Sequence, residues 1–187
     1  MHRALKLFFV AAMLAASAAC QTLDEPTWEA AREERLRQAN YQATAALMRQ
    51  TGLPASTSNR QPGSDAPFIV ATLANVNALE QSSTLGRVIS EHIGSWLTQS
   101  GRQVVEMKVR NSIYMKRNEG EFLLTREIRE VAAAHDAQGV VVGTYAEGAV
   151  FLHVSLKLVD PANSQVLAAH DYTLPLDRQI KSLLRAR

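Results

Sequence analysis

Two His-Asp pairs, His135-Asp136 and His170-Asp171, are the residues of this chain best suited to acid–base or metal chemistry. An imidazole beside a carboxylate can move a proton, and both groups can bind a transition metal. A metal site needs further ligands at a defined spacing, such as two histidines separated by three residues, and the sequence has no such pattern. We therefore expect no metal. His92, on the apolar face of a helix, should be hydrogen-bonded and half-buried, and His135 should lie at a helix end.

Nucleophilic and phosphate-binding chemistry have equally little support. The chain has no Gly-x-Ser-x-Gly motif, and the segment from Gly139 (GVVVGT) lacks the lysine and the glycine spacing of a phosphate loop. Glu119 and Glu121 lie near arginines in the sequence, so the simplest interpretation is a solvated loop of ion pairs. The alternative is a partner-binding loop, because exposed loops on a rigid scaffold commonly carry recognition. Its candidate residues are Tyr114, Glu119, Gly120, Glu121 and Arg126. We expect no enzyme activity and no cofactor.

Cys20 is the only cysteine, so it cannot form a disulfide within the chain. It follows a short basic start and thirteen residues, Leu7–Ala19, that are apolar except for Ser17. A membrane-spanning helix needs about 20 apolar residues, whereas this length fits the core of a secretory signal. The segment resembles a bacterial lipoprotein signal, which implies acylation of Cys20, with palmitate as one possible chain. Gln21, in place of an aspartate, favours the outer membrane.

Ser17 stands where lipoprotein signals usually have leucine, which leaves an alternative open. An ordinary signal peptidase could cut near Ala18 and release a soluble periplasmic protein with a free thiol. Lipidation remains the preferred interpretation because Cys20 otherwise has no role. The predicted domains are 1–19, a signal peptide; 20–66, the lipidated start with a helix and a linker; and 67–187, the folded domain.

The charge balance argues against nucleic-acid binding. Twenty Lys and Arg face eighteen Asp and Glu, and two of the basic residues, Arg3 and Lys6, lie in the predicted signal. The remaining chain is therefore neutral, without the basic excess that phosphate backbones require. Aromatic residues make up only 6% of the chain, which disfavours a base-stacking surface.

The pattern after the signal predicts an α/β domain preceded by an N-terminal helix. A helix from Pro26 to about Gln50 carries a thin apolar stripe, so it either packs one face on the domain or stands off as a stalk. Gly52–Pro67 is a polar linker rich in proline, glycine and serine. The domain should contain a mixed sheet in the order β-α-β-α-β-β-β, with helices packed on one face and a closing antiparallel meander.

The predicted elements of the domain follow from apolar periodicity and capping residues. They are strands at Phe68–Leu73, Val104–Val109, Gly139–Tyr145, Ala149–Val159 and Gln165–Tyr172, and helices at Ser83–Gln99, from a cap near Thr125, and from a cap at Asp177.

Several separate motifs resemble the FlgO-type outer-membrane lipoproteins, in the order found in that family. They include STLGR from Ser83, GEF from Gly120 and GTY from Gly143, and the resemblance extends from about Tyr41 to Leu184. Some members of the family are implicated in flagellum-associated envelope structure and motility. No catalytic role is attached to these positions in the family.

The strand order also looks like a wider group that contains the TolB amino-terminal domain, the curli secretion lipoprotein and peptidoglycan-synthase activator lipoproteins. Together the resemblances imply a non-enzymatic outer-membrane lipoprotein that faces the periplasm and docks on an envelope assembly such as the flagellar basal body. The alternative is a periplasmic regulator of an envelope enzyme such as a peptidoglycan synthase. The expected partners are the outer membrane, through the lipid, and envelope proteins, without nucleic acid.

Overall fold

A computed structural model of the chain describes residues 34–52, 66–78, 83–107, 113–115 and 122–185. The chain divides into two compact units, and every helix and strand below belongs to the second, Arg35–Arg187. The predicted signal peptide and Cys20 lie outside the described residues. Within the described ranges, the model contains no helix with both the length and the apolarity to cross a membrane.

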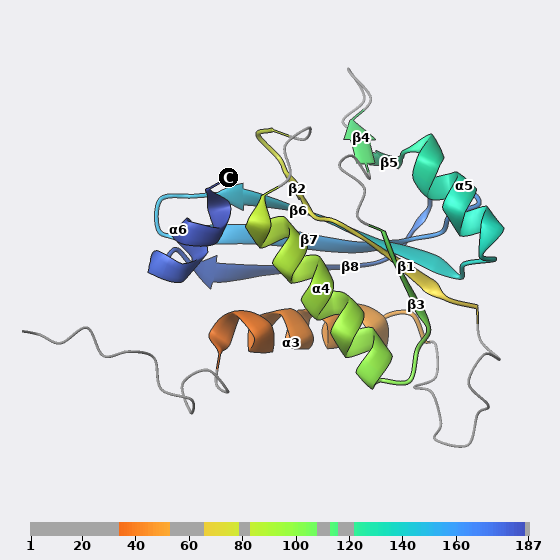
Figure 1. The fold of residues 1–187 in the computed structure, drawn as a ribbon, viewed down its shortest axis with the longest axis horizontal. Helices are drawn as coiled ribbons and strands as arrows, with labels where there is room; N and C mark the ends of the chain where they lie inside the picture. The colour runs from red at the N-terminus through yellow and green to blue at the C-terminus, as the bar shows by residue number, and fades with distance from the viewer. Residues whose placement is uncertain (1–33, 53–65, 79–82, 108–112, 116–121, 186–187) are drawn as a thin grey trace, which may run out of the picture. The chain divides into compact units, whose positions relative to one another are not determined.

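The described elements alternate between helix and strand as the sequence predicted (Figure 1). In chain order they are α3 (Arg35–Arg49), β1 (Phe68–Ala71), β2 (Ala74–Asn75), α4 (Thr84–Gln99), β3 (Val104–Met107), β4 (Ile113–Met115), β5 (Phe122–Leu124), α5 (Arg126–Ala134), β6 (Gly139–Glu147), β7 (Phe151–Val159), β8 (Val166–Pro175) and α6 (Arg178–Leu184).

The main sheet is mixed, in the order β3-β1-β6-β7-β8. β1 pairs in parallel with both β3 and β6, and β6, β7 and β8 form the expected antiparallel meander. The short strand β2 continues beyond β1 and also pairs in parallel with β6, Ala74 opposite Thr144. The predicted mixed sheet with helices packed on it is therefore confirmed.

The prediction that the helices lie on one face of the sheet is wrong. One core joins α3, α4 and α6 to one sheet face, and a second core packs Leu124, Ile128 and Ala132 of β5 and α5 against the opposite face. The strand order explains this arrangement. β3 and β6 flank β1 on opposite sides, so two right-handed crossovers run in opposite directions and place α4 and α5 on opposite faces.

Two smaller features also differ from the expected pattern. β8 continues to Pro175 rather than stopping at Tyr172, whereas the predicted end of β3 at Val109 lies outside the described residues. A separate two-stranded sheet, β4–β5, occupies a segment that was expected to be a polar loop. The predicted caps agree with the structure: Ser83, Thr125 and Asp177 each accept a hydrogen bond from a backbone N–H in the first turn of their helices.

Helix α3 packs on the domain rather than standing off as a stalk. Its fully buried Asn40 accepts a hydrogen bond from the Tyr172 hydroxyl at 2.6 Å and donates one from Nδ2 to His92 Nδ1 at 2.9 Å. Past the end of the helix, Gln50 Nε2 donates to the Ala169 carbonyl at 2.8 Å. These bonds tie α3 to both α4 and β8, and they confirm that His92 is a hydrogen-bonded, half-buried residue.

The start of α4 lies directly against the chain between β1 and β2. A Cβ atom on Gly86 would fall far inside van der Waals contact with the Leu73 carbonyl oxygen and 3.3 Å from Tyr145 Cε1. Beside it, the buried Tyr145 hydroxyl donates to Ser83 Oγ at 2.6 Å, and the same oxygen accepts the Gly86 N–H at 3.0 Å. The STLGR and GTY motifs therefore meet in one junction, although Ser83 and Tyr145 are separated by 62 positions.

Replacing Asn40 with leucine should lower the free energy of unfolding by about 2 kcal/mol, because the buried Tyr172 hydroxyl and His92 Nδ1 lose their partner. Chemical denaturation followed by circular dichroism measures this change. Gln38→Leu, at an exposed position of the same helix, is the matched control and should stay within about 0.5 kcal/mol of wild type. Equal stability of both variants would contradict a packed α3.

Replacing Gly86 with alanine should lower the free energy of unfolding by about 2–3 kcal/mol, because the new methyl group collides with backbone that cannot move away cheaply. Gly94→Ala in the same helix is the control, since its Cβ would meet only the Glu106 carboxylate, 2.9 Å away on a flexible side chain. Helix propensity should leave that variant neutral or slightly more stable. If Gly86→Ala were as stable as Gly94→Ala, the junction would not constrain the fold.

Candidate functional site

The residues predicted from sequence to bind a lipid or a partner are only partly described by the structure. Cys20, Glu119, Gly120 and Glu121 lie outside the described residues, and their roles stay predictions. Tyr114 is the middle residue of β4, and Arg126 is the first residue of α5. The two positions belong to adjoining elements, because β4 pairs with β5 and β5 leads directly into α5 through Thr125.

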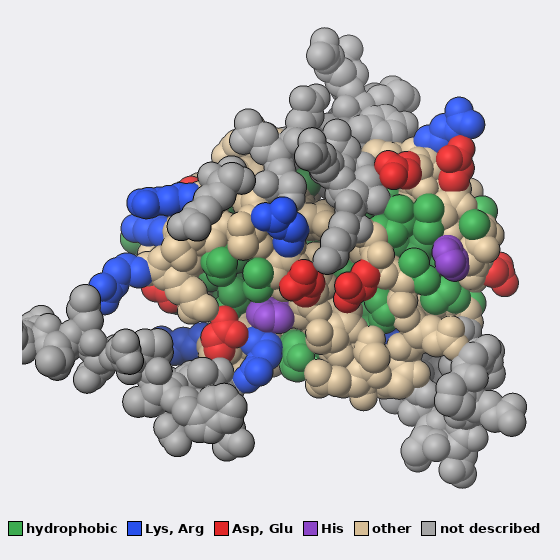
Figure 2. All heavy atoms as spheres, viewed as in Figure 1, with side chains coloured by type: hydrophobic (Ala, Val, Ile, Leu, Met, Phe, Trp, Pro, Cys, Tyr) green, Lys and Arg blue, Asp and Glu red, His purple; other side chains and the backbone are tan. Residues whose placement is uncertain are grey.

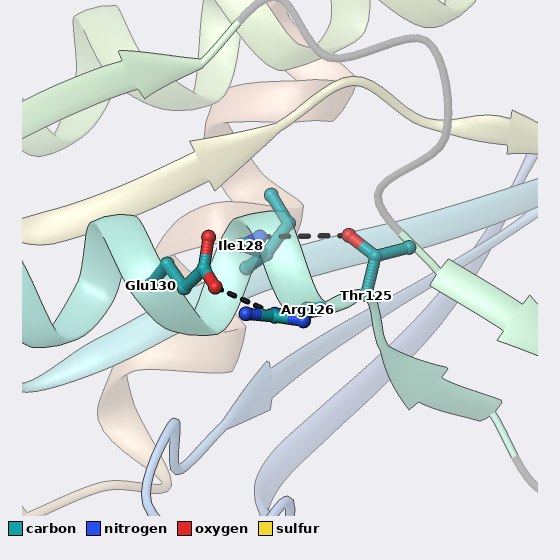
Figure 3. A network of polar contacts seen from close by, with 4 residues as sticks. All are labelled: Thr125, Arg126, Ile128 and Glu130. Atoms are coloured by element: carbon teal, nitrogen blue, oxygen red, sulfur yellow. Dashed lines mark hydrogen bonds and ion pairs between the residues drawn. The ribbon is translucent and has the colours of Figure 1, made fainter.

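The β4–β5 hairpin is attached to the domain through β5 and α5. Tyr114 pairs with Leu123 across the hairpin, and the next residue, Leu124, is buried in the core on the α5 face. Thr125 Oγ1 accepts the Ile128 N–H at 3.5 Å and so begins α5, whose Ile128 side chain is fully buried (Figure 3). A two-stranded hairpin is marginally stable alone, so this attachment holds its stem in place.

Arg126 lies on the solvent side of α5, where it forms an ion pair with Glu130. Its Nε is 2.6 Å from Glu130 Oε1, while the two side chains remain 87% and 62% exposed (Figure 3). An exposed pair one helical turn apart contributes only about 0.3–0.5 kcal/mol. Arg126 can therefore exchange Glu130 for the carboxylate of a partner at little cost. The sequence interpretation did not single out Glu130.

The crevice in which doubly wound α/β folds usually bind ligands is occupied by the chain itself. Such ligands bind at the carboxyl ends of the parallel strands, where the strand order changes direction. Here β2 passes through that place, with Leu73 and Ala74 buried just beyond the carboxyl end of β1 and Ala74 paired with β6. The space left beside α4, bordered by Arg87, Glu91 and Glu106 among others, is a cavity of about 20 Å³. A volume of that size holds about one water molecule rather than a substrate.

A wider open groove of about 610 Å³ lies over β6, β7 and β8. Strand alternation places Thr144, Ser155 and Asp171 side by side across it, with His153 and Thr173 in the next row. Serine, histidine and aspartate on one face suggest a catalytic triad, which sequence reasoning missed because the three residues come from two strands. The signal that could have found them is the alternation of β7.

The geometry of the groove does not support that triad. A Cβ on Gly148 would be 3.4 Å from His153 Nε2, so the imidazole leans toward the β6–β7 turn, whereas Ser155 and Asp171 lie farther along the strands. In the part of the chain that the structure describes, no hydrogen bond joins His153 to Ser155 or to Asp171. A triad requires both bonds. The described ranges also contain no group of three His, Cys, Asp or Glu residues able to hold a metal ion.

The tyrosine hydroxyls with perturbed acidity are structural rather than catalytic. Burial raises the pKa of Tyr145, an effect that the hydrogen bond to Ser83 partly opposes. Burial likewise raises the pKa of Tyr172. Both hydroxyls stay neutral and serve as donors, one to the cap of α4 and the other to Asn40. With a side chain only 1% exposed, Tyr145 cannot meet a substrate.

Comparison with known structures finds several proteins that are similar to this chain. The LpoB C-terminal domain from Salmonella enterica is 11% identical, with 75% of this chain and 98% of that chain covered and a TM-score of 0.48. A PelC dodecamer from Paraburkholderia phytofirmans is 16% identical, with 70% and 96% covered and a TM-score of 0.44. TolB from Acinetobacter baumannii is 20% identical, with 61% and 24% covered and a TM-score of 0.37.

Comparison with protein families gives a more specific result. No curated protein matches the chain. The family model described as FlgO protein matches residues 41–179, which include most of α3, both cores of the domain and the start of α6. Because the matched residues make up most of the sequence, the chain belongs to the FlgO protein family.

Proposed function

We propose that this chain is a non-enzymatic lipoprotein of the outer membrane, whose domain faces the periplasm and acts as a structural or assembly module of the envelope. The observation that carries the proposal is the match to the FlgO family across the whole folded domain. The filled crevice at the carboxyl ends of β1 and β6 supports it, because the place where this type of fold usually binds a small molecule is taken up by Leu73 and Ala74.

The lipid on Cys20 is the device that brings the domain to its partners. Fourteen positions separate Cys20 from Glu34, after which α3 is already packed on the domain. A fully extended chain spans at most about 3.5 Å per residue, so the tether reaches about 50 Å. The acyl chains thus confine the domain to a thin layer beside one membrane and raise its effective concentration near other components there.

The contact with the partner is assigned to the β4–β5 hairpin and the exposed first turn of α5. Arg126 is held in a defined position there by a capped helix and by Ile128 in the core, yet its guanidinium stays open to solvent. A pre-organised cation of this kind suits a carboxylate on a partner protein. For a member of this family, the partner assembly that we propose is the flagellar basal body.

Replacing Cys20 with serine should abolish incorporation of radioactive palmitate and release the protein from the membrane fraction. The physical reason is that the acyl chains supply about 0.8 kcal/mol of membrane affinity per buried methylene group, and serine offers no thiolate to carry them. Cell fractionation and autoradiography measure both effects. Ser17→Ala, which keeps the cysteine, is the control. Unlabelled wild-type protein with a free thiol would refute the anchor.

A photo-reactive residue at Glu127, which leaves Arg126 intact, should cross-link to rod or ring proteins of the flagellar basal body in a flagellated host. The same residue at Asn163, exposed in the β7–β8 turn, is the control and should give no such product. Arg126→Gln combined with the Glu127 probe should reduce the yield several-fold. Cross-linking to a peptidoglycan synthase instead would support the regulatory role and contradict the flagellar one. Normal motility in a deletion strain would also contradict the flagellar role.

A further inference from the structure

The short C-terminal helix α6 has two opposite faces. Ile180 is buried against the core on the α4 side of the sheet, and Leu183 and Leu184 pack partly against the same core. Its other face is exposed and basic. Arg178, Lys181 and Arg185 follow one another at intervals of three and four residues, which places them in one stripe along the helix and just past its end. Because the apolar face of α6 is packed on the core, the side chains of Arg178, Lys181 and Arg185 point to solvent.

Exposed apolar side chains lie at the same end of the domain. Val150 and Phe151, in and after the β6–β7 turn, are 66% and 47% exposed. The Leu176 N–H, two residues before α6, donates to the Val150 carbonyl at 3.0 Å, so this turn adjoins the helix. Val76, 38% exposed, is bound through its N–H to the Tyr145 carbonyl near the end of β6. The apolar groups and the cations of α6 thus lie at the same end of the sheet. Phe151 alternates with Leu152, which is in the core on the α6 side, so Phe151 points to the opposite sheet face, where Val76 borders the groove with His153.

We call this surface the α6 end and define it by the six side chains that it exposes. They are Val76, Val150, Phe151, Arg178, Lys181 and Arg185. Two carboxylates lie close to it, those of Glu147 and Asp177. The Asp177 carboxylate accepts the Ile180 N–H at 2.9 Å as the cap of α6. Figure 2 shows several basic side chains at this end of the molecule with acidic ones among them, and both kinds also occur in the middle and on the side of α5.

The chain enters the domain at the same end as the basic face of α6. α3 begins at the end of the molecule where α6 lies, and its other end points toward the side of α5 (Figure 1). The residues that lead to Cys20 therefore join the domain beside the α6 end. A lipid on Cys20 would therefore tether the domain through this end.

We propose that the α6 end binds the surface of an anionic phospholipid bilayer, with Val150 and Phe151 entering the interface and the three cations contacting lipid phosphates. Apolar side chains beside Lys and Arg are the usual composition of surfaces that lie in a membrane interface. A second copy of this chain is a poorer occupant, because two α6 ends facing each other would oppose like charges. The choice of membrane rests on the proposed anchor at Cys20, whereas the lipid binding itself does not.

The test uses the mature chain, residues 20–187, carrying Cys20→Ser so that no acyl chain contributes. It should sediment with vesicles of phosphatidylglycerol and phosphatidylcholine, and not with phosphatidylcholine alone. Lys181→Gln with Arg185→Gln should weaken binding about twentyfold, because each cation near an anionic surface adds roughly a factor of five. Phe151→Ser should weaken it about fivefold through lost apolar burial.

Matched controls remove the same groups elsewhere. Arg49→Gln with Arg129→Gln takes away two exposed cations outside the α6 end, and Leu167→Ser removes an apolar side chain that is 46% exposed, close to the 47% of Phe151. Both should bind vesicles like the parent chain, and circular dichroism should show all variants folded. Equal binding to neutral vesicles, or equal losses in the controls, would overturn the proposal.

Two further outcomes separate this proposal from others. If Phe151→Ser changed the sedimentation coefficient of the protein alone and left vesicle binding unchanged, the surface would belong to a second copy and the proposal would fail. The vesicle assay uses protein without a lipidated cysteine, so it is independent of the anchor. If vesicle binding is observed but the wild type is not labelled with palmitate, the anchor at Cys20 is rejected and the proposal for the α6 end stands. The reverse result would reject only the α6 end.

Discussion

The close approach of α4 to the chain after β1 is the constraint on which the rest of the domain depends. Gly86 rests against the Leu73 carbonyl, so no side chain separates the helix from the backbone that it crosses. That contact lets Tyr145 reach the cap at Ser83 and keeps β2 paired with β6. The start of α4 is thus joined to the end of β6, and the position of α4 on the sheet is fixed. A larger residue at position 86 would separate them.

The same contact bears on what the protein can do. With Leu73 and Ala74 buried just beyond the carboxyl end of β1, the crevice that many α/β proteins use for a ligand is filled by the chain itself. The groove over β7 and β8 remains open, but His153 leans toward Gly148 and away from the serine and aspartate that would complete a triad. In the described residues, neither the crevice beyond β1 nor the groove over β7 and β8 has the geometry of an enclosed active site. The exposed surfaces of the domain suit recognition of a macromolecule better than catalysis.

The sequence predicted local structure well and the layering less well. Capping at Ser83, Thr125 and Asp177 and the alternation along β7 are local signals, and each agrees with the structure. The position of α5 on the opposite face depends on the order of strands in the sheet, which periodicity does not record. The β4–β5 hairpin was missed because its strands are three residues long. In the candidate site, Tyr114 and Arg126 lie on elements linked through β5, and their role stays a prediction, whereas the pair of Arg126 with Glu130 depends on where α5 begins.

The proposed attachments act together on orientation. A lipid at the end of a fourteen-position tether limits the distance of the domain from the membrane but does not select the face that it presents. A second contact through the α6 end would remove most of that rotational freedom. Because α5 lies toward the opposite end of the domain in Figure 1, this contact would point Arg126 and the stem of the hairpin away from the lipid. The entropy lost at the membrane would then not be lost again on docking, so a modest interface around Arg126 could bind a neighbouring envelope component.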